Sequence, residues 1–321
     1  MSYRRIRVIG VPVMVAVFSL FASGSVAAQS TTPWGDPDIQ GIWHSSGATP
    51  MERPSEFEGR ETLSNEEVAE IRAATIARNE QLLLANAQRT QAGGNVGAYN
   101  NFWMERGVRS NRTSMLVDPP DGQFPPLTPA GELASETRLK SPAGVELDDT
   151  WQDRHIWERC VTRGGMPNAM FPRAYNNNMQ VFQAPGYVVM LLEQVHELRV
   201  VPLDGRPSPE IPQWHGEARG HWDHDTLVVE STSYTADTGF RGATGAVRLT
   251  ERFTRVGPDT IHYEITADDS ATWTSPWTLM FPMAKTDQPV FEYACHEGNY
   301  GLENILRNAR LEDLGIIQTQ P

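Results

Sequence analysis

The chain has 321 residues, of which 39% are hydrophobic and 21% are charged, and its 26 glycines and 23 prolines favour many turns. This composition excludes collagen, a coiled coil and wholesale disorder. The formal net charge is −13, with 40 acidic against 27 basic residues, so we expect no nucleic-acid partner and no attraction to anionic lipid.

Residues 1–28 have the three parts of a secretory signal peptide. Three arginines come first, the apolar run Val8–Phe21 follows, and small residues end at Ala28. The run is shorter than the roughly 20 residues that span a bilayer, and we predict no integral membrane segment. The mature protein is therefore expected to be periplasmic or secreted, after cleavage near Ala28.

Two cysteines, Cys160 and Cys295, would then reach an oxidising compartment. An even count there favours a disulfide between them. The alternative is a nucleophilic Cys295 acting beside His296. We consider it weaker, because neighbouring residues of a strand point to opposite faces.

Helices are predicted in residues 29–145, which we interpret as an N-terminal extension. The capping box Ser64-Asn65-Glu66-Glu67 predicts a helix from Ser64 to about Gln88. A second helix is predicted from Thr128 to about Leu139, with Thr128 as the N-cap and proline at the first helical position. Both helices are expected to pack over the remainder of the chain.

From Asn178 onward the sequence is typical of successive strands. The run Ile261–Ile265 alternates between apolar and polar residues, and Gly257–Asp259 separates it from the candidate strand Leu249–Val256. Further candidate strands are Met179–Gln183, Tyr187–Val201, Thr226–Ser231, Thr278–Phe281 and Val290–His296. This pattern predicts a mainly β protein in which residues 146–321 form an antiparallel barrel of the calycin or lipocalin type.

Four segments resemble a family of uncharacterised exported proteins from Gram-negative soil bacteria. They are PWGDPDIQGIW at 33–43, YNNN at 175–178, GHW with DTLVVE within 220–230, and ACHEGNY at 294–300. The resemblance covers nearly all of the mature chain and implies export and a general shape, without a mechanism. Some relatives carry Arg at the position of His221 and Gly at that of His224.

The first candidate catalytic residue is His196, in the predicted strand Tyr187–Val201. Alternation along one continuous strand would turn His196 toward an apolar interior and Glu193 and Arg199 toward the opposite face. An imidazole in a half-dry cavity can exchange protons near neutral pH. The alternative is a core histidine that is hydrogen-bonded to a carbonyl group.

A second candidate group follows Cys295. If the chain turns at Gly298, then His296, Glu297, Asn299 and Tyr300 converge on one small volume. They would supply a base, an acid and an amide that anchors the substrate. The alternative is a structural corner clamped by the disulfide.

A third candidate group is Tyr175-Asn176-Asn177-Asn178, directly before a predicted strand. Consecutive amides are tolerated in turns, and a plain loop is one interpretation. The other is that Tyr175, Asn176, Asn177 and Asn178 bind substrate at the mouth of the barrel, since carboxamides hold carbonyl or carboxylate groups without titrating.

Metal and cofactor signals are weak. His215, His221 and His224 form the densest histidine cluster, but their spacing is loose, and we favour an exposed turn over a metal site. The chain contains no GxxxxGK loop, Rossmann glycine fingerprint, GxSxG elbow or CxxCH haem site. We therefore expect no organic cofactor.

The function predicted from these patterns is an exported enzyme without an organic cofactor that moves protons on a small, partly apolar or aromatic molecule, as an isomerase, lyase, hydratase or hydrolase does. His296 or His196 would be the base, and Glu297 or Tyr300 the acid. Substrate would be held by Tyr175, Asn176, Asn177, Asn178, Arg199 and Asn299. The alternative is a non-catalytic periplasmic barrel that binds a small molecule. Both hypotheses place the ligand in a hollow barrel.

Overall fold

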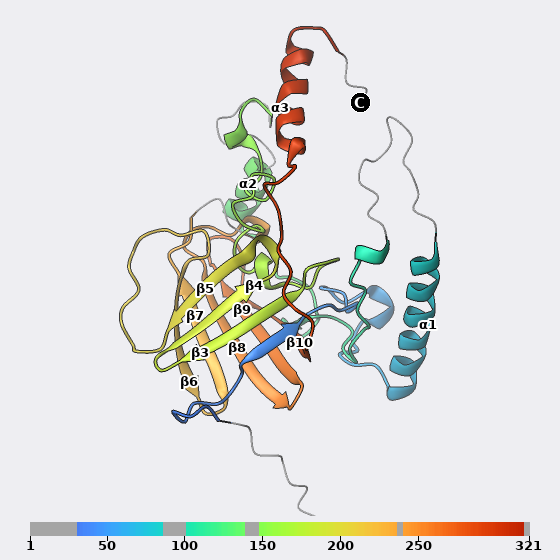
Figure 1. Ribbon diagram of the computed structural model, residues 1–321, viewed down its shortest axis with the longest axis vertical. Helices are drawn as coiled ribbons and strands as arrows, with labels where there is room; N and C mark the ends of the chain where they lie inside the picture. Colours follow the sequence, from blue (N-terminus) through green and yellow to red (C-terminus); the bar gives the residue numbers. More distant parts are fainter. Residues whose placement is uncertain (1–30, 86–100, 139–147, 236–239, 318–321) are drawn as a thin grey trace, which may run out of the picture.

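The computed structural model describes residues 31–85, 101–138, 148–235 and 240–317, and Figure 1 shows their arrangement. Ten strands in these residues form one antiparallel sheet that curls into a nearly closed barrel, and three α-helices of the same residues lie outside it. The prediction of a mainly β, antiparallel barrel is confirmed. The predicted signal peptide lies outside the described residues.

The strands lie in the order β5-β4-β3-β1-β10-β9-β8-β7-β6, and β2 pairs with β10. Their bounds are β1 Gly41–His44, β2 Leu116–Asp118, β3 Asn178–Ala184, β4 Tyr187–Leu192, β5 Glu197–Pro202, β6 Glu217–Asp223, β7 Thr226–Thr232, β8 Arg248–Gly257, β9 Thr260–Asp268 and β10 Trp277–Thr286. Strand β1 lies between β3 and β10. Residues 29–145, which we expected to be an extension, therefore supply two strands of the sheet.

The end strands β5 and β6 approach each other where the barrel nearly closes. Gly220 of β6 permits this approach, because a Cβ atom at that position would lie 2.7 Å from Leu203 Cδ2 and 2.8 Å from Val201 Cγ1. A larger side chain there would push the two edges apart.

Helix α1 (Asn65–Leu84) begins at the predicted capping box. Ser64 Oγ accepts the Glu67 N–H at 3.2 Å, and a Glu67 carboxylate oxygen accepts the Ser64 N–H at 2.8 Å. The helix ends before the predicted limit at Gln88, and none of its residues is buried. It therefore lies beside the barrel in Figure 1 instead of being embedded in its core.

Two shorter helices complete the described fold. Helix α2 (Pro129–Arg138) starts where predicted, and Thr128 Oγ1 accepts the Gly131 N–H at 3.0 Å. Helix α3 (Tyr300–Asp313) was not predicted, and Figure 1 shows that it extends beyond one end of the barrel.

Two predicted strands were wrong. The segment Tyr187–Val201 is not continuous, because a tight turn at Gln194–His196 separates β4 from β5. The segment Val290–His296 forms no strand and runs as irregular chain after β10. Pro289 precedes it, and proline has no N–H to contribute to a sheet ladder.

Large aromatic side chains pack inside the barrel. The rings of Trp273 and Trp277 meet edge to face, with centroids 5.4 Å apart. The Tyr263 ring lies between those of Phe253 and Phe281, at centroid distances of 4.8 Å and 5.1 Å. All five side chains are buried. These side chains occupy much of the barrel interior, where both functional hypotheses placed the ligand.

The predicted disulfide is confirmed. Cys160 and Cys295 are bonded at an S–S distance of 2.05 Å and tie the irregular segment after β10 to the chain that precedes β3. None of the helices in the described part of the chain combines the length and the hydrophobicity that a membrane span requires.

Candidate functional site

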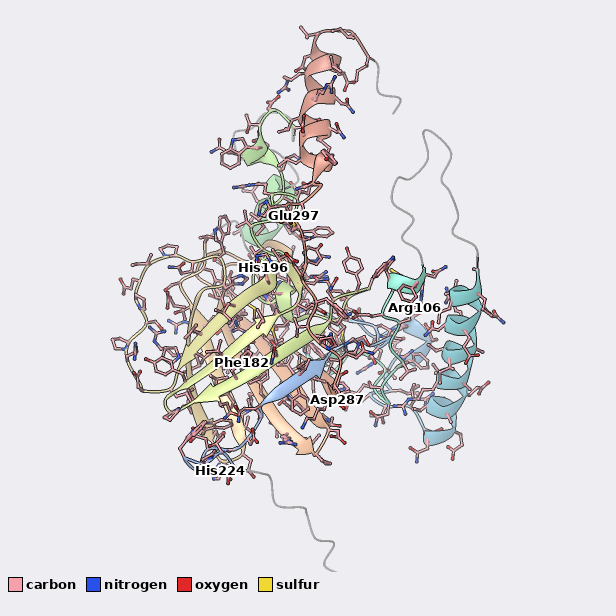
Figure 2. All side chains as sticks on the ribbon, in the orientation of Figure 1. Arg106, Phe182, His196, His224, Asp287 and Glu297 are labelled. Carbon is pink, nitrogen blue, oxygen red and sulfur yellow. A yellow bond between two sulfur atoms is a disulfide. The ribbon has the colours of Figure 1, made fainter. Side chains whose placement is uncertain are left out.

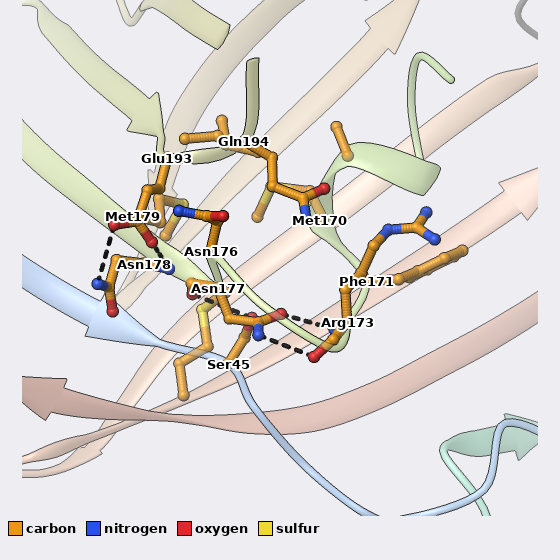
Figure 3. Close-up of a pocket in the computed structure, with 13 residues that line it drawn as sticks. Ser45, Met170, Phe171, Arg173, Asn176, Asn177, Asn178, Met179, Glu193 and Gln194 are labelled. Carbon is orange, nitrogen blue, oxygen red and sulfur yellow. Dashed lines mark hydrogen bonds between the residues drawn. The ribbon is translucent and has the colours of Figure 1, made fainter. Parts of the chain in front are cut away.

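The YNNN motif lies where the chain enters β3, and the carboxylates of Glu105 and Glu193 accept hydrogen bonds from it. Glu105 accepts the backbone N–H groups of Asn176 at 2.8 Å and Asn177 at 3.0 Å, and the Asn177 amide N–H at 2.7 Å. Glu193 accepts the backbone N–H of Asn178 at 3.2 Å (Figure 3). The amides are therefore part of a preorganised polar network at one end of the barrel.

Asn178 also contacts a histidine that sequence reasoning missed. Its Oδ1 lies 2.8 Å from His44 Nδ1, and His44 Nε2 lies 2.6 Å from Ser46 Oγ. His44 is the last residue of β1, which pairs with β3, so the sheet register brings the two side chains together. Both ring nitrogens of His44 are therefore engaged by neighbouring side chains.

A small pocket opens beside the motif (Figure 3). Its polar lining includes Arg173, Asn176 and Gln194, and its apolar lining includes Met179 and Leu192. Its volume is about 20 Å³, which suits a single water molecule. The amides thus line a cavity, but a ligand larger than water requires the chain around it to move.

Two arginines, Arg163 and Arg173, also lie at this end of the barrel. The Arg163 guanidinium lies 3.6 Å from the centroid of the Trp157 ring, and its Nε donates to Gln194 Oε1 at 2.7 Å. Arg173 donates from Nη2 to the Asn168 carbonyl at 2.9 Å, while its buried Nε has no hydrogen-bond partner among the described residues. Burial, together with the charge of Arg163, lowers the pKa of Arg173 to about 10. An anion bound between them would offset the repulsion between the charges of Arg163 and Arg173.

A buried carboxylate and an imidazole lie next to these arginines. Glu197, the first residue of β5, is 5% exposed, and its Oε1 accepts the Thr162 hydroxyl at 2.6 Å and the Arg163 backbone N–H. Its Oε2 lies 3.6 Å from His215 Nε2. Glu197 Oε2 and His215 Nδ1 have no hydrogen-bond partner in the described part of the chain. We call these two residues the Glu–His pair.

The electrostatics of the Glu–His pair favour a neutral imidazole. Burial lowers the pKa of His215, the neighbouring Glu197 carboxylate opposes this effect, and the Arg199 charge adds to it. At neutral pH the ring therefore keeps one nitrogen free of a proton. Because Glu197 faces Nε2, the free nitrogen is expected to be Nδ1.

The orientation predicted for β5 was wrong. Glu197 and Arg199 face the interior, while His196 and Leu198 are exposed. The turn before β5 reverses the alternation that a continuous strand would have kept. Arg199 is consequently not on the outer face, and its guanidinium is engaged with Glu251 inside the barrel.

The ACHEGNY residues lie at the same end of the barrel but on its surface. His296, Glu297 and Tyr300 are exposed, and Figure 2 shows Glu297 beyond the end where His196 lies. Asn299 is more enclosed and donates to the Glu158 carbonyl at 3.1 Å. Neither His196 nor His296 therefore faces the inside of the barrel.

The histidine cluster is dispersed. His221 is exposed on β6, and His224 is exposed in the following turn, 2.9 Å from Asp223, while His215 is in the Glu–His pair. In the described ranges, no three side chains of the His, Cys, Asp and Glu types lie together as a metal site would require.

Sequence reasoning missed Glu197 and His215 as a pair, because they come from different parts of the chain and share no local motif. The chain matches no protein-family model, no curated protein and no solved structure. The function is therefore inferred from the geometry of the site.

Proposed function

We propose that this chain is an exported, calycin-like barrel enzyme that performs acid–base chemistry on a small molecule without an organic cofactor. The reaction type is an isomerisation, elimination, hydration or hydrolysis. The observation that supports this proposal best is the Glu–His pair, in which a buried carboxylate faces one nitrogen of an imidazole whose other nitrogen has no partner among the described residues. The disulfide agrees with a periplasmic or secreted location.

His215 is the proposed general base. The Glu197 carboxylate would hold the tautomer that carries its proton on Nε2, which leaves the Nδ1 lone pair to accept a proton from the substrate. Once His215 is protonated, the same carboxylate stabilises the imidazolium. Thr162 and the Arg163 backbone fix the other carboxylate oxygen, so Glu197 can support His215 without moving.

The arginines define the substrate's polar group. Within the described residues the Arg173 Nε has no partner, and burial and Arg163 lower the pKa of Arg173, so it would gain most from a carboxylate on the substrate. Arg163 connects the proposed anion site to the proposed base, because its backbone N–H donates to Glu197 and its charge acts on Arg173. Once the chain around the small pocket opens, Met179 and Leu192 would provide apolar contacts for the rest of the molecule.

Hydrogen exchange with solvent tests this proposal even though the substrate is unidentified. The purified protein is incubated in D₂O with a small-molecule extract of a Gram-negative soil bacterium, and mass spectrometry follows metabolites that gain deuterium or are converted. We expect at least one carboxylate-bearing metabolite to change with the wild-type protein and to remain unchanged with His215→Asn.

The matched control is His221→Asn, which makes the same substitution at an exposed histidine on β6. It should behave like the wild type. If the wild-type protein and His215→Asn give the same metabolite profile, the proposed base is wrong. A metabolite that binds both proteins without exchange would support the non-catalytic binding barrel.

A further inference from the structure

An open groove of about 670 Å³ lies on the outer wall of the barrel, and neither residue of the Glu–His pair lines it. Its floor consists of outward-facing residues of neighbouring strands, Ile42 of β1, Gln180 of β3 and Leu191 of β4, which are direct partners across the sheet. Its wall is the irregular segment 289–292, which we call the strap. The volume falls within the range of small-molecule sites.

The strap is fixed to the barrel by its backbone. The Phe291 N–H donates to Glu193 Oε1 at 2.8 Å, and Glu193 is 1% exposed. The disulfide at Cys295 provides a second anchor a few residues later. The Phe291 side chain is nevertheless 61% exposed. The backbone of Phe291 is thus fixed beside the groove, while most of the surface of its ring is open to solvent.

The turn between β4 and β5 directs a polar group to the same groove. Val195 and His196 both have left-handed backbone angles, with φ of 56° and 42°, although neither is glycine or asparagine. This turn buries Gln194 on the inner side and leaves His196 in the groove lining. The groove therefore has an apolar floor, an aromatic wall and a polar end formed by His196.

The charged residues around the groove limit the charge that its ligand can carry. The described residues that line it include the carboxylates of Glu193 and Glu292 and no lysine or arginine. An anionic ligand would be repelled, whereas a hydrogen-bond donor on the ligand can meet the Gln180 carbonyl, the His196 imidazole or the Glu292 carboxylate.

We propose that this groove binds a neutral planar aromatic molecule that carries a hydrogen-bond donor, of the arylamine or phenol class. Its ring stacks against Phe291 and covers Leu191 and Ile42, and its donor points to the polar end. The site contains neither His215 nor Glu197, although Leu192 and Glu193 line both this groove and the small pocket beside the YNNN motif.

Two fluorescent probes test the charge preference of the groove. N-phenyl-1-naphthylamine is a neutral arylamine, and 8-anilino-1-naphthalenesulfonate is the same skeleton with one sulfonate. We expect the neutral probe to bind the full protein at least roughly tenfold more tightly than the sulfonate, as measured by fluorescence titration. Failure of the neutral probe to bind, or equal affinity for both probes, would overturn the proposal.

Substitution of the ring identifies the site. Phe291→Ala should weaken binding of the neutral probe at least roughly tenfold. Phe182→Ala is the matched control, because Phe182 is another exposed phenylalanine of the barrel wall that does not line the groove (Figure 2). It should bind the probe like the wild type, as should His215→Asn. An equal loss in both phenylalanine variants, or none in Phe291→Ala, would contradict the location.

Discussion

Arg199 of β5 and Glu251 of β8 form an ion pair inside the barrel. Arg199 Nη1 donates to Glu251 Oε1 at 3.0 Å, a second bond joins Nη2 to Oε2, and the Tyr263 hydroxyl donates to the same carboxylate at 2.8 Å. The side chains are 2% and 0% exposed. Because β5 and β8 are not neighbours in the sheet, the pair joins two walls across the core.

Breaking this pair should destabilise the fold strongly. Glu251→Gln leaves the Arg199 charge buried without compensation, and we expect a loss of about 3–5 kcal/mol in the free energy of unfolding, measured by urea denaturation. Asp223→Asn, which breaks the exposed pair with Arg252, should cost about 0–1 kcal/mol. A similar small effect for both variants would show that the core tolerates the unpaired guanidinium.

The disulfide should stabilise the fold, because it closes a long loop and so restricts the unfolded chain. Cys160 and Cys295 are separated by 135 residues, and the chain-entropy model gives at most about 5 kcal/mol for a loop of that length. We expect dithiothreitol to lower the urea midpoint of the wild-type protein. The double variant Cys160→Ser/Cys295→Ser should already have the lower midpoint and should not respond to the reductant. A wild-type midpoint that is unchanged by reduction would contradict this contribution.

The elements that the sequence predicted correctly carry local signals. The Ser64 and Glu67 capping box marks the start of α1 because both partners lie within one turn. Alternation in Ile261–Ile265 and the turn residues before it predict the β8–β9 hairpin, since a strand with one buried face must alternate. Two cysteines in a chain with an expected export signal leave only one intramolecular pairing.

The errors arose where tertiary contacts override local patterns. The turn at Val195 and His196 lacks the glycine or asparagine that usually marks left-handed angles, so the sequence pattern predicted one long strand. That single omission reversed the predicted faces of His196 and Arg199. The Glu–His pair was missed because the contact between Glu197 and His215 depends on how β5 and the chain before β6 meet at the barrel seam.

Substitutions at His196 should reveal the strain in this turn. His196 is exposed and has a φ of 42°, so His196→Gly should leave stability unchanged or raise it by up to about 1 kcal/mol. His196→Val should lower it by about 1 kcal/mol or more, because a β-branched residue tolerates this backbone region poorly. Urea denaturation of both variants measures the two changes in the free energy of unfolding. A glycine variant less stable than the valine variant would show that the side chain itself stabilises the turn.

The stability of the protein should depend on pH through His215. Burial lowers the pKa of this imidazole below its ordinary value of 6.5, despite the nearby Glu197 and with the added effect of Arg199. The unfolded chain therefore binds the proton more strongly than the folded protein. The contribution of neutral His215 to stability is complete above about pH 6.5 and is lost progressively as the pH falls through that value toward the folded pKa.

The comparison of His215→Asn with the wild type isolates this dependence, since the other titrating groups are common to both proteins. Urea denaturation between about pH 5 and pH 8 should show the wild type losing more free energy of unfolding on acidification than the variant. His221→Asn should follow the wild type, because His221 is exposed. Parallel curves for His215→Asn and the wild type would mean that the imidazole is not desolvated. A smaller loss in the wild type would mean that attraction to Glu197 outweighs burial and that the pKa of His215 lies above its ordinary value in the folded protein.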